Sequence, residues 1–319
     1  MFSIGIDLGG TNVAVGIVDE NHKIIKKGSV PTLAYRPCEE IIGDMVTLCN
    51  RLCAECGFRI CDAEGIGIAC PGTVNGKTGI VEYANNIKFY DFPLTETFSK
   101  ISGFSKEKIT IGNDANFAAY GESVAGAAKG TSSSVTITLG TGVGSGIIID
   151  GKILTGCAFG GGELGHTVIV KDGRPCTCGR KGCFEAYCSA TALIAETKKK
   201  YLATRSAILN DICGGDVNSI GGRTVFAALH RGDGAAKEVF EEYISYLACG
   251  IVNIINIFQP EVICIGGGIS GEKDNLLIPL LPLISDQIYS KDHTLKTKIC
   301  IAALGNDAGI IGAAAASLA

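Results

Sequence analysis

Ser-Ile-Gly-Ile-Asp-Leu-Gly-Gly-Thr-Asn-Val-Ala-Val-Gly-Ile-Val-Asp occupies residues 3–19, where two apolar, β-branched runs flank Gly9, Gly10 and Thr11. Such runs around a glycine pair predict a β-hairpin with a glycine-rich tip. The tip exposes backbone N–H groups that can approach phosphate oxygens, and Thr11 adds a hydroxyl. Asp7, at the end of the first run, would place a carboxylate at the same point. An ordinary hairpin turn explains the two glycines equally well.

The same pattern returns in the middle of the chain, where residues 136–150 read Thr-Ile-Thr-Leu-Gly-Thr-Gly-Val-Gly-Ser-Gly-Ile-Ile-Ile-Asp. Aligning Gly9 with Gly140 also aligns other identical pairs: Ile6 with Ile137, Leu8 with Leu139, Ile17 with Ile148, and Asp19 with Asp150. The repetition predicts a duplicated fold, in which two facing glycine loops clamp a polyphosphate across a cleft. A third cluster, Gly266 to Gly268, follows a strand-like run at 262–265 and resembles a nucleotide-binding turn.

A set of metal-ligand residues lies between residues 160 and 185. Cys176, Cys178 and Cys183 have the spacing Cys-x-Cys-Gly-x-x-Gly-Cys, and His166 precedes them. Three thiols and an imidazole form a complete ligand set for one tetrahedral zinc. A site closed by four protein ligands is structural, because no position remains for a catalytic water. The alternative is that three of the fifteen cysteines cluster by chance.

Two carboxylates flank this metal loop: Glu163 before His166 and Glu185 after the last cysteine. Carboxylates fixed near an imidazole suit a ligand rich in hydroxyl groups, because each carboxylate accepts hydrogen bonds in pairs. The loop is therefore expected to form a rigid wall of a polyol-binding site. Asn85 and Asn86 offer side-chain amides that suit sugar hydroxyls, although they are equally ordinary as turn residues.

Asp114 is the candidate general base. A short strand at 109–112 runs into Asn113 and Asp114, and an alanine-rich helical stretch follows at 117–128. A carboxylate on a rigid element, beside an amide that orients the substrate, suits proton abstraction. The alternative is that Asp114 is simply the N-cap of that helix.

Composition restricts the remaining possibilities. The net charge is −4 and the basic residues are scattered, which argues against a nucleic-acid partner. An odd number of cysteines in a chain of this length, without a signal peptide, indicates a reduced, cytoplasmic protein whose twelve other cysteines are mostly small buried hydrophobes. No apolar run is long enough to span a membrane. Helical periodicity marks 190–201 and 235–258, a small-residue helix at 308–319 is expected to pack closely on a sheet, and 211–223 reads as a loop.

Several of these motifs occur in the order found in the ROK family, and the resemblance covers nearly the whole chain. They are Asp7-Leu-Gly-Gly-Thr11, Asn113-Asp114, Leu139-Gly-Thr-Gly-Val-Gly144, Glu163-x-Gly-His166, Cys176-x-Cys-Gly-x-x-Gly-Cys-x-Glu185 and Gly266-Gly-Gly268. That family comprises bacterial sugar kinases and related repressors within the hexokinase–actin superfamily, and the chain most resembles its glucokinases. The zinc motif is the specific part of the match.

The resemblance implies an α/β protein with a two-domain hexokinase/actin-like fold, a duplicated ribonuclease H-like fold with a central cleft. Residues 1–116 with 303–319 would form the smaller domain, which the C-terminal helix rejoins, and 117–302 the larger one with the zinc loop. The implied reaction is ATP-dependent phosphorylation of the 6-hydroxyl of a hexose, with glucose expected. A homodimer or homotetramer is expected.

The resemblance also implies roles for individual residues. Asp114 would take the proton from the sugar hydroxyl, and Asp7, Gly9, Gly10 and Thr11 would attend magnesium and phosphate. The sugar would be held, together with Asp114, by Asn86, Asn113, Glu163, His166 and Glu185. The rest of the nucleotide would be held by Gly140, Thr141, Gly142, Gly144, Gly266, Gly267 and Gly268. Structural zinc would bind His166, Cys176, Cys178 and Cys183.

Some alternatives stay open from the sequence. The acceptor could be N-acetylmannosamine, N-acetylglucosamine, fructose or allose, since Phe89 replaces a tryptophan frequent in glucokinases and Cys70 occupies the Pro-Gly loop near the sugar. A non-catalytic sugar sensor is a further alternative, and a zinc hydrolase is excluded by the closed metal site. Because the nucleotide loops lie elsewhere in the sequence, losing zinc is expected to weaken sugar binding far more than ATP binding.

Overall fold

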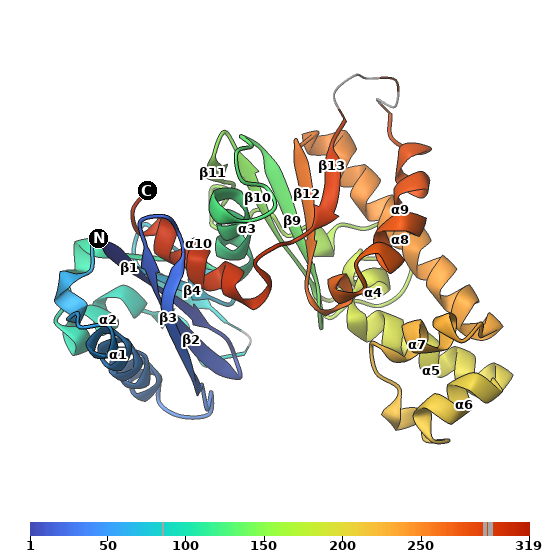
Figure 1. The fold of residues 1–319 in the computed structure, drawn as a ribbon, viewed down its shortest axis with the longest axis horizontal. Helices are drawn as coiled ribbons and strands as arrows, with labels where there is room; N and C mark the ends of the chain where they lie inside the picture. Colours follow the sequence, from blue (N-terminus) through green and yellow to red (C-terminus); the bar gives the residue numbers. More distant parts are fainter. Residues whose placement is uncertain (85, 290–291, 293–295) are drawn as a thin grey trace. The chain divides into compact units, whose positions relative to one another are not determined.

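The computed structural model describes residues 1–84, 86–289, 292 and 296–319 (Figure 1). Asn85, from the predicted sugar loop, lies outside the described residues. The chain forms two compact units. Unit 1 comprises Met1–Thr136, Gly146–Gly162 and Ala303–Ala319, and unit 2 comprises Ile137–Ser145 and Glu163–Ala302. Among the described residues, no helix is both long enough and apolar enough to cross a membrane.

Unit 1 begins with the predicted hairpin. β1 (Phe2–Leu8) and β2 (Asn12–Asp19) are antiparallel, with Leu8 opposite Val13, so residues 9–11 form the tip. β-branched residues, which are Ile4 and Ile6 in β1 and four residues in β2, favour the pleated conformation up to the glycine tip. This part of the sequence prediction is confirmed.

The hairpin is the first part of a five-stranded sheet with the order β3-β2-β1-β4-β8. β3 (Ile24–Pro31) pairs antiparallel with β2, whereas β4 (Ile66–Cys70) pairs parallel with β1, and β8 (Ile109–Asn113) parallel with β4. The carboxyl ends of β1, β4 and β8 therefore meet at one edge of the sheet, which is where open α/β sheets bind ligands.

Strand alternation places the two faces of this sheet against different helices. The even-numbered residues of β1 and β4 are buried in a core shared with α1 (Cys38–Glu55) and α2 (Leu94–Ser102). The odd-numbered residues face the other side, where α3 (Asp114–Ala125) and α10 (Ala308–Ala316) pack. This period of two is the expected consequence of a pleated strand buried on both faces.

Helix α10 lies close against the sheet because Gly5 of β1 and Gly67 of β4 face its backbone (Figure 1). A Cβ atom on Gly67 of β4 would lie 1.8 Å from the carbonyl oxygen of Ala313, so only glycine permits this approach of the two backbones. The sequence predicts that the small-residue helix packs closely on a sheet, and the structure confirms this packing, with the helix ending at Ala316.

A second five-stranded sheet repeats the topology of the first. It contains β9 (Ser134–Leu139), β10 (Val143–Ile149), β11 (Lys152–Ile153), β12 (Val262–Gly266) and β13 (Lys298–Ile301). The order is β11-β10-β9-β12-β13, in which each strand has a counterpart at the same place in the first sheet. The duplication inferred from the two glycine motifs is therefore confirmed at the level of the whole sheet.

The remaining elements are a small third sheet and the helices of unit 2. Unit 1 also has a small antiparallel sheet made of β5 (Thr73–Asn75), β6 (Ile80–Tyr83) and β7 (Tyr90–Phe92). The other helices are α4 (Glu185–Cys188), α5 (Ala190–Thr204), α6 (Ala207–Cys213), α7 (Thr224–His230), α8 (Gly234–Phe258) and α9 (Asp274–Ser285).

Three predictions about individual segments need correction. Helix α3 starts at Asp114 rather than at residue 117, because Asn113 caps it. The stretch 211–223 is not simply a loop, since α6 extends to Cys213 and a 3-10 turn follows at Val217–Ser219. Half rather than most of the twelve cysteines outside the metal loop are buried; Cys61 and Cys157, for example, are exposed.

Candidate active site

Two partly buried carboxylates lie at the carboxyl edge of the sheet in unit 1. Asp7 ends β1 and Asp114 follows β8, and the parallel register brings these strand ends together beside Cys70 of β4. Burial, with a smaller contribution from the Asp114 carboxylate, raises the pKa of Asp7 to about 6. Burial also raises the pKa of Asp114, although N–H groups of the first turn of α3 oppose the shift. Shifts of this kind, with this cause, are frequent in catalytic and cation-binding carboxylates.

The first turn of α3 fixes Asp114 in place. The side chain of Asn113 accepts a hydrogen bond from the Asn116 N–H at 3.1 Å and donates one to the carbonyl oxygen of Gly72 at 3.1 Å. Asp114 itself accepts from the Ala115 N–H at 2.8 Å. Asn113 is therefore the N-cap, and the alternative in which Asp114 serves as the cap is wrong.

The first glycine loop is anchored by a threonine that follows β3. The hydroxyl of Thr32 donates to the carbonyl oxygen of Gly9 at 2.6 Å, and its N–H donates to the carbonyl oxygen of Thr11 at 2.8 Å. Gly10 lies directly against Asn86, because a Cβ atom on Gly10 would be 2.8 Å from the Cβ of Asn86. Because the carbonyl oxygens of Gly9 and Thr11 are hydrogen-bonded to Thr32, the loop has a defined backbone whose N–H groups can bind an anion.

The second glycine loop, in unit 2, is anchored in a similar way by helix α5. The Ala190 N–H donates to the carbonyl oxygen of Gly140, and the Thr191 hydroxyl donates to that of Thr141, both at 2.8 Å. A tight turn closes the loop, since the Gly140 N–H donates to the carbonyl oxygen of Gly142 at 3.0 Å. The neighbouring Gly144 is in β10.

The third glycine cluster follows β12. Gly266 ends the strand, Gly267 has a left-handed φ of 82°, and Gly268 begins a 3-10 helix. A Cβ atom on Gly267 would lie 2.6 Å from the backbone nitrogen of Leu139, at the end of β9. The structure thus brings the second and third clusters side by side within unit 2, although they are distant in the sequence.

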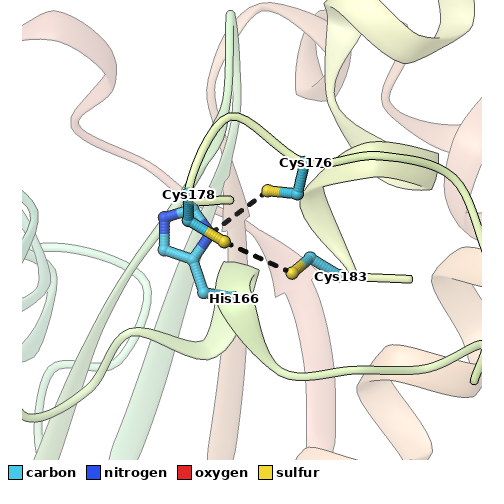
Figure 2. Close-up of side chains that lie close together, drawn as sticks. All are labelled: His166, Cys176, Cys178 and Cys183. Atoms are coloured by element: carbon cyan, nitrogen blue, oxygen red, sulfur yellow. Dashed lines mark hydrogen bonds between the residues drawn. The ribbon is translucent and has the colours of Figure 1, made fainter. Parts of the chain in front are cut away.

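The four predicted metal ligands converge in unit 2 (Figure 2). The ligand atoms of His166, Cys176, Cys178 and Cys183 all lie within 4.8 Å of one another. The Cys176 sulfur is 3.6 Å from Nδ1 of His166, and the Cys178 sulfur is 3.6 Å from that of Cys183. Bonds of about 2.3 Å to sulfur in a tetrahedron require ligand separations of roughly 3.8 Å, so these residues fit one zinc ion.

The metal loop has the backbone that such convergence needs. Gly179 and Gly182 have left-handed φ values of 86° and 81°, which allow two reversals between the cysteines. Pro175 bridges to Lys181, which closes the loop as a small antiparallel pair. The Arg180 backbone N–H lowers the pKa of the Cys178 thiol, which favours the thiolate that a metal requires.

Glu163 is one of the two predicted sugar-binding carboxylates of unit 2. Glu163 precedes the 3-10 helix that carries His166, and its carbonyl oxygen accepts the His166 N–H at 3.1 Å. Since Nδ1 of His166 faces Cys176, Nε2 is the nitrogen left for another partner.

Glu185 makes a contact that the sequence does not reveal. Its Oε2 accepts the Val143 N–H of the second glycine loop at 3.0 Å, and its Oε1 accepts the hydroxyl of Thr177 at 3.3 Å. The carboxylate therefore links the metal loop to the second glycine loop. We therefore expect metal loss to reach the second glycine loop through this contact, as a smaller effect beside the larger one on sugar binding. No local pattern predicts it, because the partners are far apart in the sequence.

The predicted residues thus gather in two groups, one in each unit. Unit 1 holds Asp7, the first glycine loop, Asn86, Asn113 and Asp114, and unit 2 holds the metal cluster, Glu163, Glu185 and the other two glycine clusters. Oxygen ligands such as the carboxylates of Asp7 and Asp114 suit Mg²⁺, whereas the thiol and imidazole set suits zinc.

Sequence and structure comparisons identify the relatives of this chain. Glucokinase from Thermotoga maritima is 35% identical over 98% of this chain and 95% of its own length. Glucokinase from Streptomyces coelicolor is 34% identical over 98% of this chain and 96% of its own length. The crystal structure of a ROK family glucokinase from Streptomyces griseus, in complex with glucose and AMPPNP, superposes with a TM-score of 0.81 at 33% identity over 99% of both chains. The ROK family model matches residues 3–319, and the chain belongs to the ROK family.

Proposed function

We propose that this protein is an ATP-dependent glucokinase that transfers the γ-phosphoryl group of ATP to the 6-hydroxyl of glucose. The observation that carries the proposal is the partly buried Asp114 carboxylate, fixed by the capped first turn of α3 beside Asp7. The similarity to glucokinases along nearly the whole chain supports the same activity.

In this mechanism Asp114 is the general base. Its ionised carboxylate accepts the proton of the sugar hydroxyl as that oxygen attacks the γ-phosphorus. Burial raises the pKa of Asp114, which makes its carboxylate a stronger base than an exposed aspartate. The capping bonds of Asn113 hold the helix turn rigid, so the base keeps its orientation.

The other groups bind and orient the two substrates. We assign the sugar hydroxyls to Asn86, Asn113, Glu163, His166 and Glu185, whose amide, imidazole and carboxylate groups can donate or accept hydrogen bonds. The backbone N–H groups of the first glycine loop, with the Thr11 hydroxyl, would bind phosphate oxygens, and Asp7 would hold magnesium there. Magnesium held there would neutralise charge that develops on the transferred phosphoryl group. Residues 140–144 and 266–268 would hold the remaining nucleotide.

We assign structural zinc to His166, Cys176, Cys178 and Cys183. Bound through Nδ1, His166 keeps its Nε2 proton as a hydrogen-bond donor, which suits a sugar hydroxyl or the Glu163 carboxylate. We also propose that the protein is a cytoplasmic homodimer or homotetramer.

The test is an ADP-release assay with glucose, mannose, fructose, allose, N-acetylglucosamine and N-acetylmannosamine. Glucose is expected to give the highest kcat/KM. Asp114→Asn is expected to lose about two to four orders of magnitude in kcat while glucose and ATP still bind, measured by calorimetry. Asp286→Asn, a change on the surface of unit 2, is the matched control and should keep full activity.

The outcomes separate the parts of the proposal. ADP release with none of these sugars would reject the kinase function. A higher kcat/KM for an N-acetylated sugar would change the acceptor and leave the kinase assignment in place. Near-normal turnover of Asp114→Asn would remove Asp114 as the base.

A further inference from the structure

Helix α10 carries two glycines, Gly309 and Gly312, which lie against different parts of unit 1. A Cβ atom on Gly312 would lie 1.7 Å from the carbonyl oxygen of Phe117 in α3, which is a clash with backbone. For a Cβ atom on Gly309, the three nearest atoms all belong to the side chain of Asp7, at 2.8 Å from Oδ2, 3.0 Å from Cγ and 3.5 Å from Cβ. Gly312 is thus explained by helix packing, whereas Gly309 leaves room for one carboxylate.

Glycine in a helix needs such an explanation, because it is intrinsically less favourable there than alanine by about 1 kcal/mol. Every other residue of α10 is alanine or isoleucine, so alanine at position 309 would continue the pattern. The backbone itself does not prevent this, since Gly309 has an ordinary helical conformation rather than a left-handed φ. The contact with Asp7 is the reason that remains.

We propose that Gly309 is a positioning residue for Asp7, which keeps the carboxylate in the rotamer that serves the magnesium and phosphate of the reaction. This inference rests on the proposed kinase function. A methyl group at position 309 leaves β1 and α10 in place and forces the Asp7 side chain to rotate away, because that side chain is the only part of the contact that can move freely. A displacement of about 1 Å at such a group is enough to lower a rate by about a hundredfold.

The test compares three glycine-to-alanine variants. Gly309→Ala is expected to fold with a Tm equal to or above that of the wild type, to bind glucose normally, and to lose at least about tenfold in kcat. Its apparent constant for Mg²⁺ should rise by at least about tenfold, and the affinity for ADP should fall in the presence of Mg²⁺ but not without it, measured by calorimetry.

The controls separate a role in folding from a role toward Asp7. Gly43→Ala in α1, where a Cβ atom meets nothing within 4 Å, should change neither turnover nor Mg²⁺ dependence. Gly312→Ala should lower the Tm, since its clash is with backbone. If Gly309→Ala keeps the wild-type kcat, Mg²⁺ constant and ADP affinity, the inference is overturned while the kinase function stands. Absence of sugar phosphorylation in the wild type would instead reject the proposed function.

Discussion

Replacing Asp7 by asparagine should make the protein more stable at neutral pH. Burial and the neighbouring Asp114 carboxylate raise the pKa of Asp7 from 3.8 to about 6, so the folded state holds this proton more tightly than the unfolded state. The stabilising contribution of proton binding is therefore complete below pH 3.8 and is lost as the pH rises to about 6. Above that pH the wild type carries a partly buried charge that asparagine removes.

The size of the effect follows from the two pKa values. At about 1.4 kcal/mol per pKa unit, ionisation of Asp7 lowers the free energy of unfolding by about 3 kcal/mol. The gain from Asp7→Asn should grow from about 1 kcal/mol at pH 4.5 to about 3 kcal/mol at pH 7.5. Activity should fall in the same variant, since the carboxylate that would hold magnesium is lost.

The measurement is urea unfolding by circular dichroism from pH 4.5 to pH 8, without nucleotide or magnesium. Asp19→Asn, at the other end of the same hairpin, is a control for which we expect a stability change of the opposite sign. The Lys23 N–H lowers the pKa of Asp19, so this replacement should be destabilising at neutral pH, with an effect that shrinks on acidification. A stability gain of Asp7→Asn that stays flat or declines as the pH rises would refute the reasoning.

Three further predictions concern the metal, the second glycine loop and the acceptor. Cys178→Ala, or chelation of zinc confirmed by metal analysis, should raise the apparent dissociation constant for the sugar at least about tenfold. The apparent constant for ATP should rise by a smaller but measurable factor, because Glu185 also binds the second glycine loop. An unchanged sugar constant in a folded, zinc-free protein would contradict this prediction. Thr191→Val should raise the KM for ATP about two- to tenfold, because it removes the hydrogen bond to Thr141. Thr191→Ser keeps the hydroxyl and should keep the wild-type KM, and Thr204→Val on the same helix should not change the KM. A deoxy analogue of glucose that lacks a bound hydroxyl should have a kcat/KM lower than that of glucose by orders of magnitude. Equal turnover of the analogue would show that the site does not bind that hydroxyl.

Much of the fold could be predicted because its signals are local. A glycine pair between two β-branched runs specifies a hairpin within a few residues, and its repetition at Gly140 specifies a second copy of the same sheet. The metal loop was equally predictable, since its ligands share one short segment with fixed spacing. In each case the sequence pattern and the structure that it forms occupy the same stretch of chain.

Other features depend on tertiary contacts and left no readable pattern. Helix α9 contains Pro279 and Pro282, which ordinarily predict a helix end, and no helix was expected there. The hydrogen bond of Glu185 to Val143 and the contact of Gly309 with Asp7 join segments that no spacing rule connects. Asp114 could be named as a candidate base, but only the side-chain bonds of Asn113 show which of the two adjacent residues caps the helix.

The two glycine loops show how a duplicated sheet can acquire two different tasks. Both have carbonyl oxygens held by a threonine hydroxyl and a backbone N–H, yet Thr32 follows β3 of its own sheet, whereas Thr191 comes from an inserted helix. In the first copy β1 carries Asp7, and the aligned position of β9 is Thr138, which has no charge. A carboxylate from outside the repeat, Glu185, instead reaches the second loop and ties it to the metal segment. The repeated strands therefore supply similar backbone turns, and the unrepeated insertions and single substitutions give each turn its own chemistry.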